Sequence, residues 1–147
     1  MIRDCKAKDV DTLIAMSEEF WQHTIYRKEK FDAESCKAMI EQTMTHELCL
    51  VLEIDGKVEG FICGVKGYLL ANFDIMNGTE LAWWVNEDYR KSGGGLKLLR
   101  SIEKRAKKLG VKYWNMLYMQ SSMPSSIKSI YESTGYRKSE SFYTKVL

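Results

Sequence analysis

Three consecutive glycines, Gly93 to Gly95, follow two cations, Arg90 and Lys91, and precede a segment with helical periodicity. Glycine is a poor helix former, costing up to ~1 kcal/mol relative to alanine in a helix interior. A sequence that accepts this cost at a helix start is typical of a site where backbone N–H groups must approach a ligand. The free N–H groups of a first turn and the helix dipole both favour phosphate. We therefore predict an anion-binding loop, with a plain flexible turn as the alternative.

The sequence lacks both of the common phosphate-binding motifs. The absence of G-x-x-x-x-G-K-[ST] argues against ordinary nucleoside triphosphate hydrolysis, and the absence of G-x-G-x-x-G argues against NAD or FAD. The pattern that stands in their place is Arg90-x-x-Gly93-x-Gly95.

Histidine and cysteine are the other residue types here with chemistry of their own. The ordinary pKa of histidine, about 6.5, suits a general base, but a surface position or a satisfied core position is the favoured interpretation of His23 and His46. The cysteines form no C-x-x-C pair and lie far from both histidines, so we predict no metal site. We expect reduced thiols that pack as small apolar side chains. The four cysteines are Cys5, Cys36, Cys49 and Cys63.

Two further segments accompany the glycine loop. Residues 84–90 read Trp-Val-Asn-Glu-Asp-Tyr-Arg, and residues 131–136 read Tyr-Glu-Ser-Thr-Gly-Tyr. The loop resembles the [Q/R]-x-x-G-x-[G/A] pyrophosphate loop of the GNAT superfamily, the acyl-CoA-dependent N-acyltransferases. The first segment resembles that family's V-x-P-x-Y-R approach, with Glu87 where proline is common. The second resembles its Y-x-x-x-G-[F/Y] segment, although Pro124 stands where many members carry an asparagine.

The resemblance implies that acetyl-CoA is the co-substrate and that an amine attacks its thioester directly. The pyrophosphate would rest on the backbone of the glycine loop, and the pantetheine arm would pair with the preceding strand near Trp84 and Val85. A backbone N–H there would polarise the thioester carbonyl. The residues so assigned to coenzyme A are Trp84, Val85, Arg90, Lys91, Ser92, Gly93, Gly94, Gly95 and Leu96.

The same resemblance assigns the catalytic pair. A lysine-like amine has a pKa of about 10.4, so making it neutral at pH 7 costs ~4.6 kcal/mol. Glu80, at the start of the expected fourth strand, is the first candidate for the base. Tyr131 matches the family's tyrosine that stabilises the leaving thiolate by a hydrogen bond. The alternatives are a solvated strand-end glutamate and a packed core tyrosine.

Aromatic residues occur in two places near these candidates. Trp21, His23 and Tyr26 fall in the connection between the first two helices, where the family's acceptor pocket is often lined. Trp83 and Trp84 are consecutive on one strand and therefore point to opposite faces. A plain aromatic core remains the alternative.

Charge is distributed unevenly along the chain. The 22 Lys+Arg and 20 Asp+Glu give a formal net charge of +2, but residues 90–108 hold eight basic residues and one acidic residue. Three explanations stand: the 3′-phosphate of coenzyme A, a solvated helix face, and a nucleic-acid footprint. No nucleic-acid-binding motif accompanies the segment, so we do not expect a nucleic-acid partner.

The predicted elements give an α+β, GNAT-like fold with a mixed, mostly antiparallel central sheet and helices on both of its faces. Asp9 and Asp32 are predicted helix N-caps, and Asp55-Gly56 is a strong hairpin signal. The late strands form a β-α-β unit. The expected strands are 2–6, 48–54, 58–70, 81–85, 111–119 and one or two in the tail 136–147, with a loop at 71–78 and helices after Asp9, after Asp32, at 96–109 and from Pro124 to about residue 134.

We expect one N-acetyltransferase domain over residues 1–147, acting on a primary amine. No run of about 18 apolar residues occurs and the first residues form no apolar leader, so we expect a cytoplasmic protein without a membrane partner. The sequence leaves the acceptor open and is compatible with a homodimer. The alternative function is a catalytically silent acyl-CoA-binding or interaction domain on the same scaffold.

Overall fold

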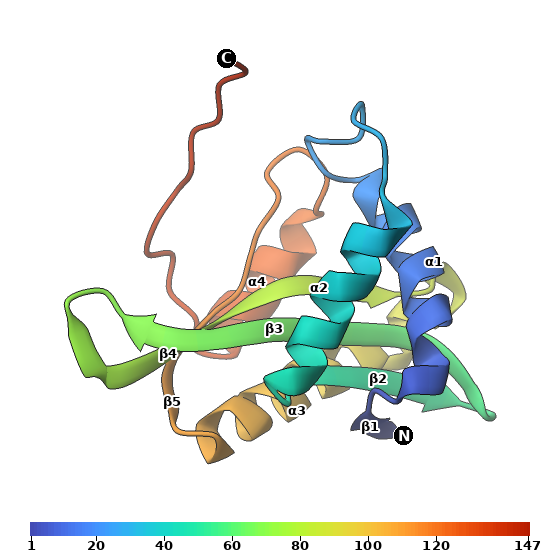
Figure 1. The fold of residues 1–147 in the computed structure, drawn as a ribbon, viewed down its shortest axis with the longest axis horizontal. Helices are drawn as coiled ribbons and strands as arrows, with labels where there is room; N and C mark the ends of the chain where they lie inside the picture. The colour runs from blue at the N-terminus through green and yellow to red at the C-terminus, as the bar shows by residue number, and fades with distance from the viewer. The chain divides into compact units, whose positions relative to one another are not determined.

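A mixed five-stranded sheet forms the centre of the computed structural model, which describes residues 1–147 (Figure 1). Its strands run in the order β1-β2-β3-β4-β5. Neighbouring strands are antiparallel except β4 and β5, which are parallel and joined through a helix. This confirms the mixed, mostly antiparallel sheet with a late β-α-β unit. The strands are β1 Ile2–Asp4, β2 Cys49–Ile54, β3 Lys57–Leu69, β4 Asn72–Val85 and β5 Val111–Asn115.

The chain divides into two compact units, Met1–Leu117 and Tyr118–Leu147. The first unit contains the whole sheet with three of the helices: α1 Val10–Trp21, α2 Ala33–Thr45 and α3 Gly94–Lys108. The second contains α4, Ser125–Ser133.

Helices cover both faces of the sheet in the first unit. Phe61 and Ile62 are neighbours on β3, both fully buried, and they point to opposite faces. Phe61 packs with Leu13 of α1 and Ile40 of α2, whereas Ile62 packs with Leu98 and other residues of α3. Fully burying a side chain of this size contributes about 1.5–3 kcal/mol. The two apolar layers therefore hold α1 and α2 on one face and α3 on the other, as predicted.

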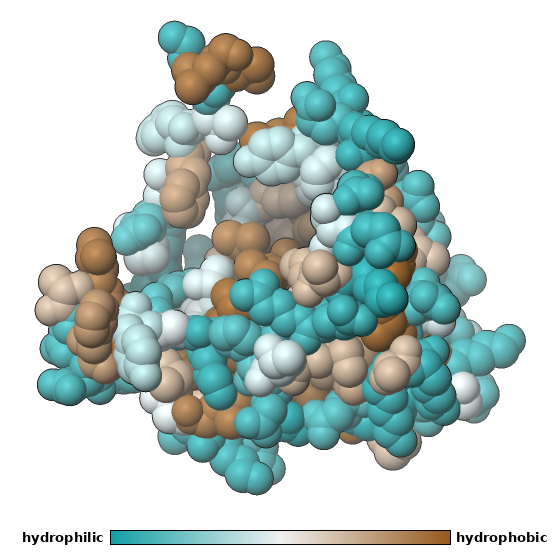
Figure 2. Space-filling model, viewed as in Figure 1, coloured by the Kyte–Doolittle hydropathy of each residue, from teal (hydrophilic) through white to brown (hydrophobic).

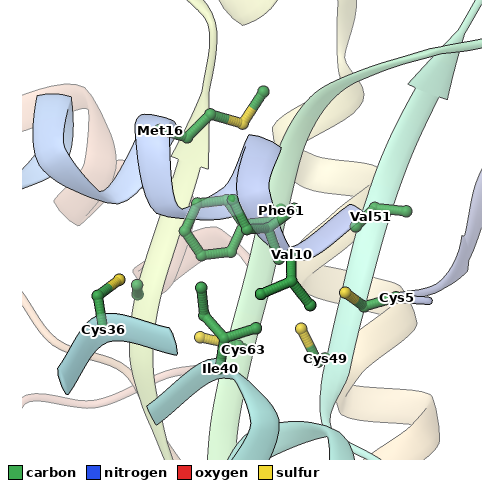
Figure 3. Close-up of a cluster of buried hydrophobic side chains, with 11 residues drawn as sticks. Cys5, Val10, Met16, Cys36, Ile40, Cys49, Val51, Phe61 and Cys63 are labelled. Carbon is green, nitrogen blue, oxygen red and sulfur yellow. The ribbon is translucent and has the colours of Figure 1, made fainter. Parts of the chain in front are cut away.

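The four cysteines are buried and free, and they line the layer beneath α1 and α2 (Figure 3). Cys49 and Cys63 are directly opposite each other on β2 and β3. The neighbouring Cys49 sulfur and burial both raise the pKa of the Cys5 thiol. Burial also raises the pKa of the Cys36 and Cys63 thiols. The cysteines therefore act as apolar packing groups, as predicted.

The two hairpins differ in how well the sequence predicts them. Asp55 and Gly56 connect β2 and β3 with φ of 48° and 76°, the positive values that a type I′ turn requires. The loop expected at 71–78 is wrong, because β4 begins at Asn72 and pairs with β3 from Leu69 onward. Figure 1 shows this hairpin extending past the end of β2. Its residues lack the alternation of a half-buried strand because much of the hairpin is exposed.

The two predicted N-caps also differ in outcome. The Asp32 carboxylate accepts a hydrogen bond from the Ser35 N–H at 3.0 Å, which confirms the cap of α2. Asp9 occupies the N-cap position of α1 but makes no side-chain cap. Its carboxylate binds the Arg3 guanidinium instead, with contacts of 2.6 and 3.1 Å. This hydrogen-bonded ion pair holds the pKa of Asp9 below its usual value.

The second unit differs from expectation at its end. Pro124 is the N-cap residue of α4 rather than its first helical residue, and Gly135, at φ of 97°, follows the helix. Residues 136–147 form no regular secondary structure, so the predicted tail strands are wrong. Phe142, Tyr143 and Val146 are all almost fully exposed. Their apolar pattern matches a strand, but no buried face supports one.

Candidate active site

The parallel pair β4–β5 separates after a short distance and leaves part of β4 without a neighbour in the sheet. Pairing ends where Thr79 faces Asn115, and β5 ends there, whereas β4 continues to Val85. The Asn115 side-chain amide donates to the Gly78 carbonyl at 3.2 Å. The edge of residues 80–85 that faces away from β3 therefore offers backbone groups to an extended ligand, in the manner of an added strand.

A β-bulge lies at the same point of β4. Cys63 pairs with Ala82 and Gly64 pairs with Glu80, so Leu81 is an extra residue on β4. A bulge of this kind bends the strand and increases its twist. It re-aims the backbone of β4 where β5 diverges.

Two strand glycines let an indole ring approach the sheet closely near the point where β4 and β5 separate. A Cβ added at Gly78 would come within 2.6 Å of the Trp114 ring, and one added at Gly64 would meet the same ring at 2.6 Å. At Gly64 it would also meet the Thr79 carbonyl oxygen at 2.5 Å. The sequence analysis missed this arrangement, although an isolated glycine inside a strand is a known sign of close approach.

We expect Gly64→Ala to lower the free energy of unfolding by about 1–3 kcal/mol, the usual effect of overpacking. The new methyl group clashes with a backbone oxygen that has little freedom to move. Gly67→Ala is the matched control on the same strand, because a Cβ there meets no atom within 4 Å. Urea unfolding of both variants measures the difference, and equal midpoints would contradict this packing.

Glu80 is buried, with 2% of its surface exposed, in the interior of β4. One carboxylate oxygen accepts a hydrogen bond from the Leu117 N–H at 3.0 Å. Burial raises the pKa of this carboxyl group to about 7. The reading of Glu80 as a solvated strand-end residue is therefore wrong, since β4 begins eight residues earlier than such an end requires. A carboxyl group with this pKa exchanges its proton near neutral pH.

The three glycines of the loop have three different environments. Gly93 has φ of 77° and open space around its Cβ position, so it makes the left-handed turn into α3. Gly94 is buried, and a Cβ there would meet the Leu52 side chain at 2.4 Å. A Cβ at Gly95 would lie 3.3 Å from Trp83. The backbone N–H groups of Gly95 and Leu96 belong to the first turn of α3 and have no acceptor within the helix.

Arg90 joins the loop to the end of β4. Its Nε donates to the Val85 carbonyl oxygen at 2.9 Å, and its guanidinium lies 4.6 Å from the centre of the Trp84 ring. Trp84 and Val85 thus hold the Arg90 side chain in place, and the resemblance assigned all three residues to coenzyme A. Lys91 and Ser92 are exposed beside the first turn of α3.

His23, in the α1–α2 connection, lies close to this end of β4, and two aromatic residues near it in the sequence stack on each other. The His23 and Trp84 rings are 5.4 Å apart, and the Trp21 and Tyr26 rings are stacked at 6.1 Å. Trp83 packs in the layer of α3, so the two tryptophans face opposite sides of the sheet, as predicted.

His46 and Tyr131 are the remaining candidates from the sequence. His46 accepts a hydrogen bond from the Lys66 N–H through Nδ1 at 3.1 Å, which is a structural role. Tyr131 belongs to the second unit, where it is buried in α4 and its ring lies 5.5 Å from that of Tyr136. No three His, Cys, Asp or Glu side chains of the chain are grouped to hold a metal ion. None of its helices has the length and apolar character needed to cross a membrane.

Comparison with known families agrees with the fold. Residues 11–136 match the model described as the acetyltransferase (GNAT) family. The chain therefore belongs to the GNAT family of acetyltransferases, whose members use acetyl-CoA. No curated protein sequence gives a significant match.

Solved structures share the fold at low sequence identity. The ribosomal-protein-alanine N-acetyltransferase of Brucella melitensis biovar Abortus 2308 is 14% identical with a TM-score of 0.76, covering 100% of this chain and 99% of that one. An aminoglycoside 6′-N-acetyltransferase of Acinetobacter haemolyticus is 14% identical with a TM-score of 0.72, at the same coverage. AAC(6′)-Iy, solved with a bisubstrate analogue containing coenzyme A, is 13% identical with a TM-score of 0.76, covering 100% of this chain and 98% of that one. The structural similarity therefore supports the fold, and identities this low support nothing beyond it.

Proposed function

We propose that residues 1–147 form one N-acetyltransferase domain that transfers an acetyl group from acetyl-CoA to a primary amine. The observation that carries this proposal is the edge of β4 at residues 80–85, which no other strand covers. Glu80, the first residue of this edge, is a buried carboxyl group with a pKa of about 7. Family membership and the AAC(6′)-Iy complex with a coenzyme A analogue support it. We place the enzyme in the cytoplasm, where thiols such as its four buried cysteines stay reduced.

The loop residues fit the phosphates of coenzyme A. The N–H groups of Gly95 and Leu96 are available at the positive end of α3. A Cβ at position 95 would lie 3.3 Å from Trp83. Lys91 adds a positive charge, and Arg90 holds the loop against β4. Bound there, acetyl-CoA supplies the activated acyl group, with its extended arm along the edge that begins at Trp84 and Val85.

Glu80 is the proposed base. A cationic amine must lose a proton before it attacks, at a cost of ~4.6 kcal/mol for a lysine-like group at pH 7. A carboxyl group with a pKa of about 7 is partly ionised at this pH and is a stronger base than an exposed glutamate. Because Glu80 is almost fully buried, the proton reaches it from an amine or a bridging water between the separating ends of β4 and β5.

Tyr131 is proposed to donate a hydrogen bond to the departing thiolate. Thiol pKa values near ~8.5 lie below the tyrosine value of about 10, so a hydrogen bond is sufficient and full proton transfer is uphill. We expect Tyr131→Phe to lower kcat about tenfold or more and to leave the Kd for acetyl-CoA within about twofold, because phenylalanine keeps the ring. The control is Tyr136→Phe, because the Tyr136 ring is adjacent to that of Tyr131. Unchanged kcat in Tyr131→Phe would remove this residue from the mechanism.

An amine panel tests the reaction itself. The protein is incubated with acetyl-CoA and a polyamine, a lysine peptide, a peptide with N-terminal alanine, or an aminoglycoside, the last two chosen from the names of the structural neighbours. We expect amine-dependent release of free coenzyme A with at least one class. Tight coenzyme A binding without release from any amine would instead support a catalytically silent acyl-CoA-binding domain.

A further inference from the structure

The solvent face of α3 carries a row of cations that the proposed reaction does not use. We call this row the cationic stripe. Each of its residues has another member three or four positions away, which places neighbours side by side on one face of a helix. All of them are exposed. The cationic stripe consists of Lys97, Arg100, Lys104, Lys107 and Lys108.

The cationic stripe carries more positive charge than the acidic side chain of its own helix can neutralise. The ion pairs of this unit join Arg3 to Asp9 and Glu53, and Arg105 to Asp4. Glu103 is the single acidic residue of α3. Like charges at helical neighbour positions destabilise the helix that carries them. The fold therefore gains nothing from this arrangement, and an anionic partner would relieve the repulsion.

The proposed coenzyme A site lies beside one end of the cationic stripe and does not extend along it. Its phosphates are proposed to rest on the first turn of α3, at Gly95 and Leu96. At 1.5 Å per residue, Lys104 to Lys108 lie about 14–20 Å further along the helix axis. A hollow of about 440 Å³ adjoins this far end. It is lined by Ser101, Lys104, Arg105 and Lys108 of α3 together with residues of β1 and Leu50.

The chemistry of the surface selects among anionic partners. A helix that inserts into a membrane surface must expose its apolar face, but Leu98, Leu99 and Ile102 are fully buried in the core. Protein interfaces are depleted in lysine and have an apolar centre, whereas this row is mostly lysine. A polyphosphate needs only regularly spaced cations. The row spans about 16 Å, over which one strand of a duplex presents about five phosphates.

We propose that the cationic stripe binds the phosphate backbone of a nucleic acid without reading its sequence. Contacts to phosphate position a protein on nucleic acid and need no base-reading motif. The absence of such a motif, on which the sequence-based expectation of no nucleic-acid partner depended, therefore does not bear on this mode of binding. The formal net charge of the chain is only +2, so binding depends on how these cations are grouped.

Fluorescence anisotropy with a 20-base-pair RNA duplex and a DNA duplex of equal length, at 50–200 mM salt, tests this inference. We expect micromolar binding near 100 mM salt and a plot of log K against log[salt] with a slope of about −4. Removing three cations should make the slope shallower by about 2.7 and weaken binding at least tenfold. Glutamine is chosen because it forms helices well. The test variant is Lys104→Gln, Lys107→Gln and Lys108→Gln combined.

A control variant with the same change in net charge separates the row from overall charge. It should keep the slope of the unmodified protein, and both variants should keep its affinity for acetyl-CoA, which also reports correct folding. If the test variant does not fold, Lys104→Gln with Lys107→Gln replaces it, with an expected change in slope of about 1.8. The control variant combines Lys8→Gln, Lys37→Gln and Lys57→Gln, all at exposed positions outside α3.

Four outcomes would overturn the proposal. One is a slope shallower than −1 for the unmodified protein, and another is an equal loss of binding in the control variant. A third is displacement of the duplex by poly-glutamate at equal charge concentration, which would indicate an acidic protein partner. The fourth is tighter binding to phosphatidylserine vesicles than to either duplex. None of these outcomes alters the proposed acetyltransferase activity, which is measured separately by release of coenzyme A.

Discussion

Gly95→Asp is expected to raise the KM for acetyl-CoA about a hundredfold, whereas Gly95→Ala should have a much smaller effect. Both variants place a Cβ 3.3 Å from the Trp83 ring, so this part of the steric change is the same in each. Only aspartate adds a negative charge where the pyrophosphate is proposed to bind. At about 5 Å and an effective dielectric constant of about 20, one pair of like charges repels by ~3 kcal/mol, which is roughly a hundredfold in affinity.

The stability of the two variants serves as the control for this experiment. An acidic side chain in the first turn of a helix interacts favourably with the helix dipole, by about 0.3–1 kcal/mol. Position 95 is the second residue of α3, so Gly95→Asp should unfold at a temperature no lower than Gly95→Ala. Isothermal titration with coenzyme A and a thermal melt measure the two quantities. Equal affinity of the alanine and aspartate variants for coenzyme A would refute the proposed phosphate site.

Glu80→Gln is expected to lower kcat by about two to four orders of magnitude and, at pH 8, to stabilise the fold. Glutamine keeps the oxygen that accepts the Leu117 N–H but cannot take a proton from the amine. In the unmodified protein, kcat/KM should rise with pH and level off above about 7, because the carboxyl group must be ionised to act as a base. The variant should lose this rise. Glu59→Gln, on the neighbouring strand β3, is the control and should keep it.

The effect on stability follows from the same raised pKa. In the unfolded chain this carboxyl group has a pKa near 4.5, whereas in the folded protein it is about 7. Between these pH values the folded state holds a proton that the unfolded state has released, so stability falls as pH rises and becomes level above 7. The difference amounts to about 3 kcal/mol.

Urea unfolding of Glu80→Gln and the unmodified protein at pH 4 and pH 8 separates burial from catalysis. We expect similar stability at pH 4 and a more stable variant at pH 8, because only the unmodified protein must bury a carboxylate there. A stabilised variant with full activity would show that Glu80 is buried but is not the base. A variant that gains no stability at pH 8 would contradict the raised pKa itself.

Local signals predicted the local parts of the fold. Asp55-Gly56 specifies a two-residue hairpin through residues that tolerate positive φ, and the structure has this turn. The apolar spacing of α3 predicts a helix whose buried side includes Leu98 and Ile102. The glycine loop located the start of that helix, although Gly94 is there for packing against Leu52 and only its neighbours remain available to a ligand.

Features that depend on distant residues were not predictable. The first residues of β4, Asn72 to Asp74, are exposed and show no alternation of apolar and polar residues, so their pattern matches a loop. Only pairing with β3 makes this segment a strand. The burial of Glu80 depends on that extension. Trp114 lies against Gly64 and Gly78, which come from two other strands. Residues 136–147 have the composition of a strand, but they form none, and their sequence does not specify a strand with which they would pair.

The burial of all four cysteines has a practical consequence for measuring this enzyme. Thiol-reactive dyes require an accessible thiolate, and the sulfurs of Cys5, Cys36 and Cys63 are buried with raised pKa values. The native protein should therefore contribute almost no background colour when such a dye follows released coenzyme A. Denaturant should expose four reactive thiols per chain, so the same dye counts unfolded molecules. One reagent then reports turnover in the native enzyme and the extent of unfolding in its variants.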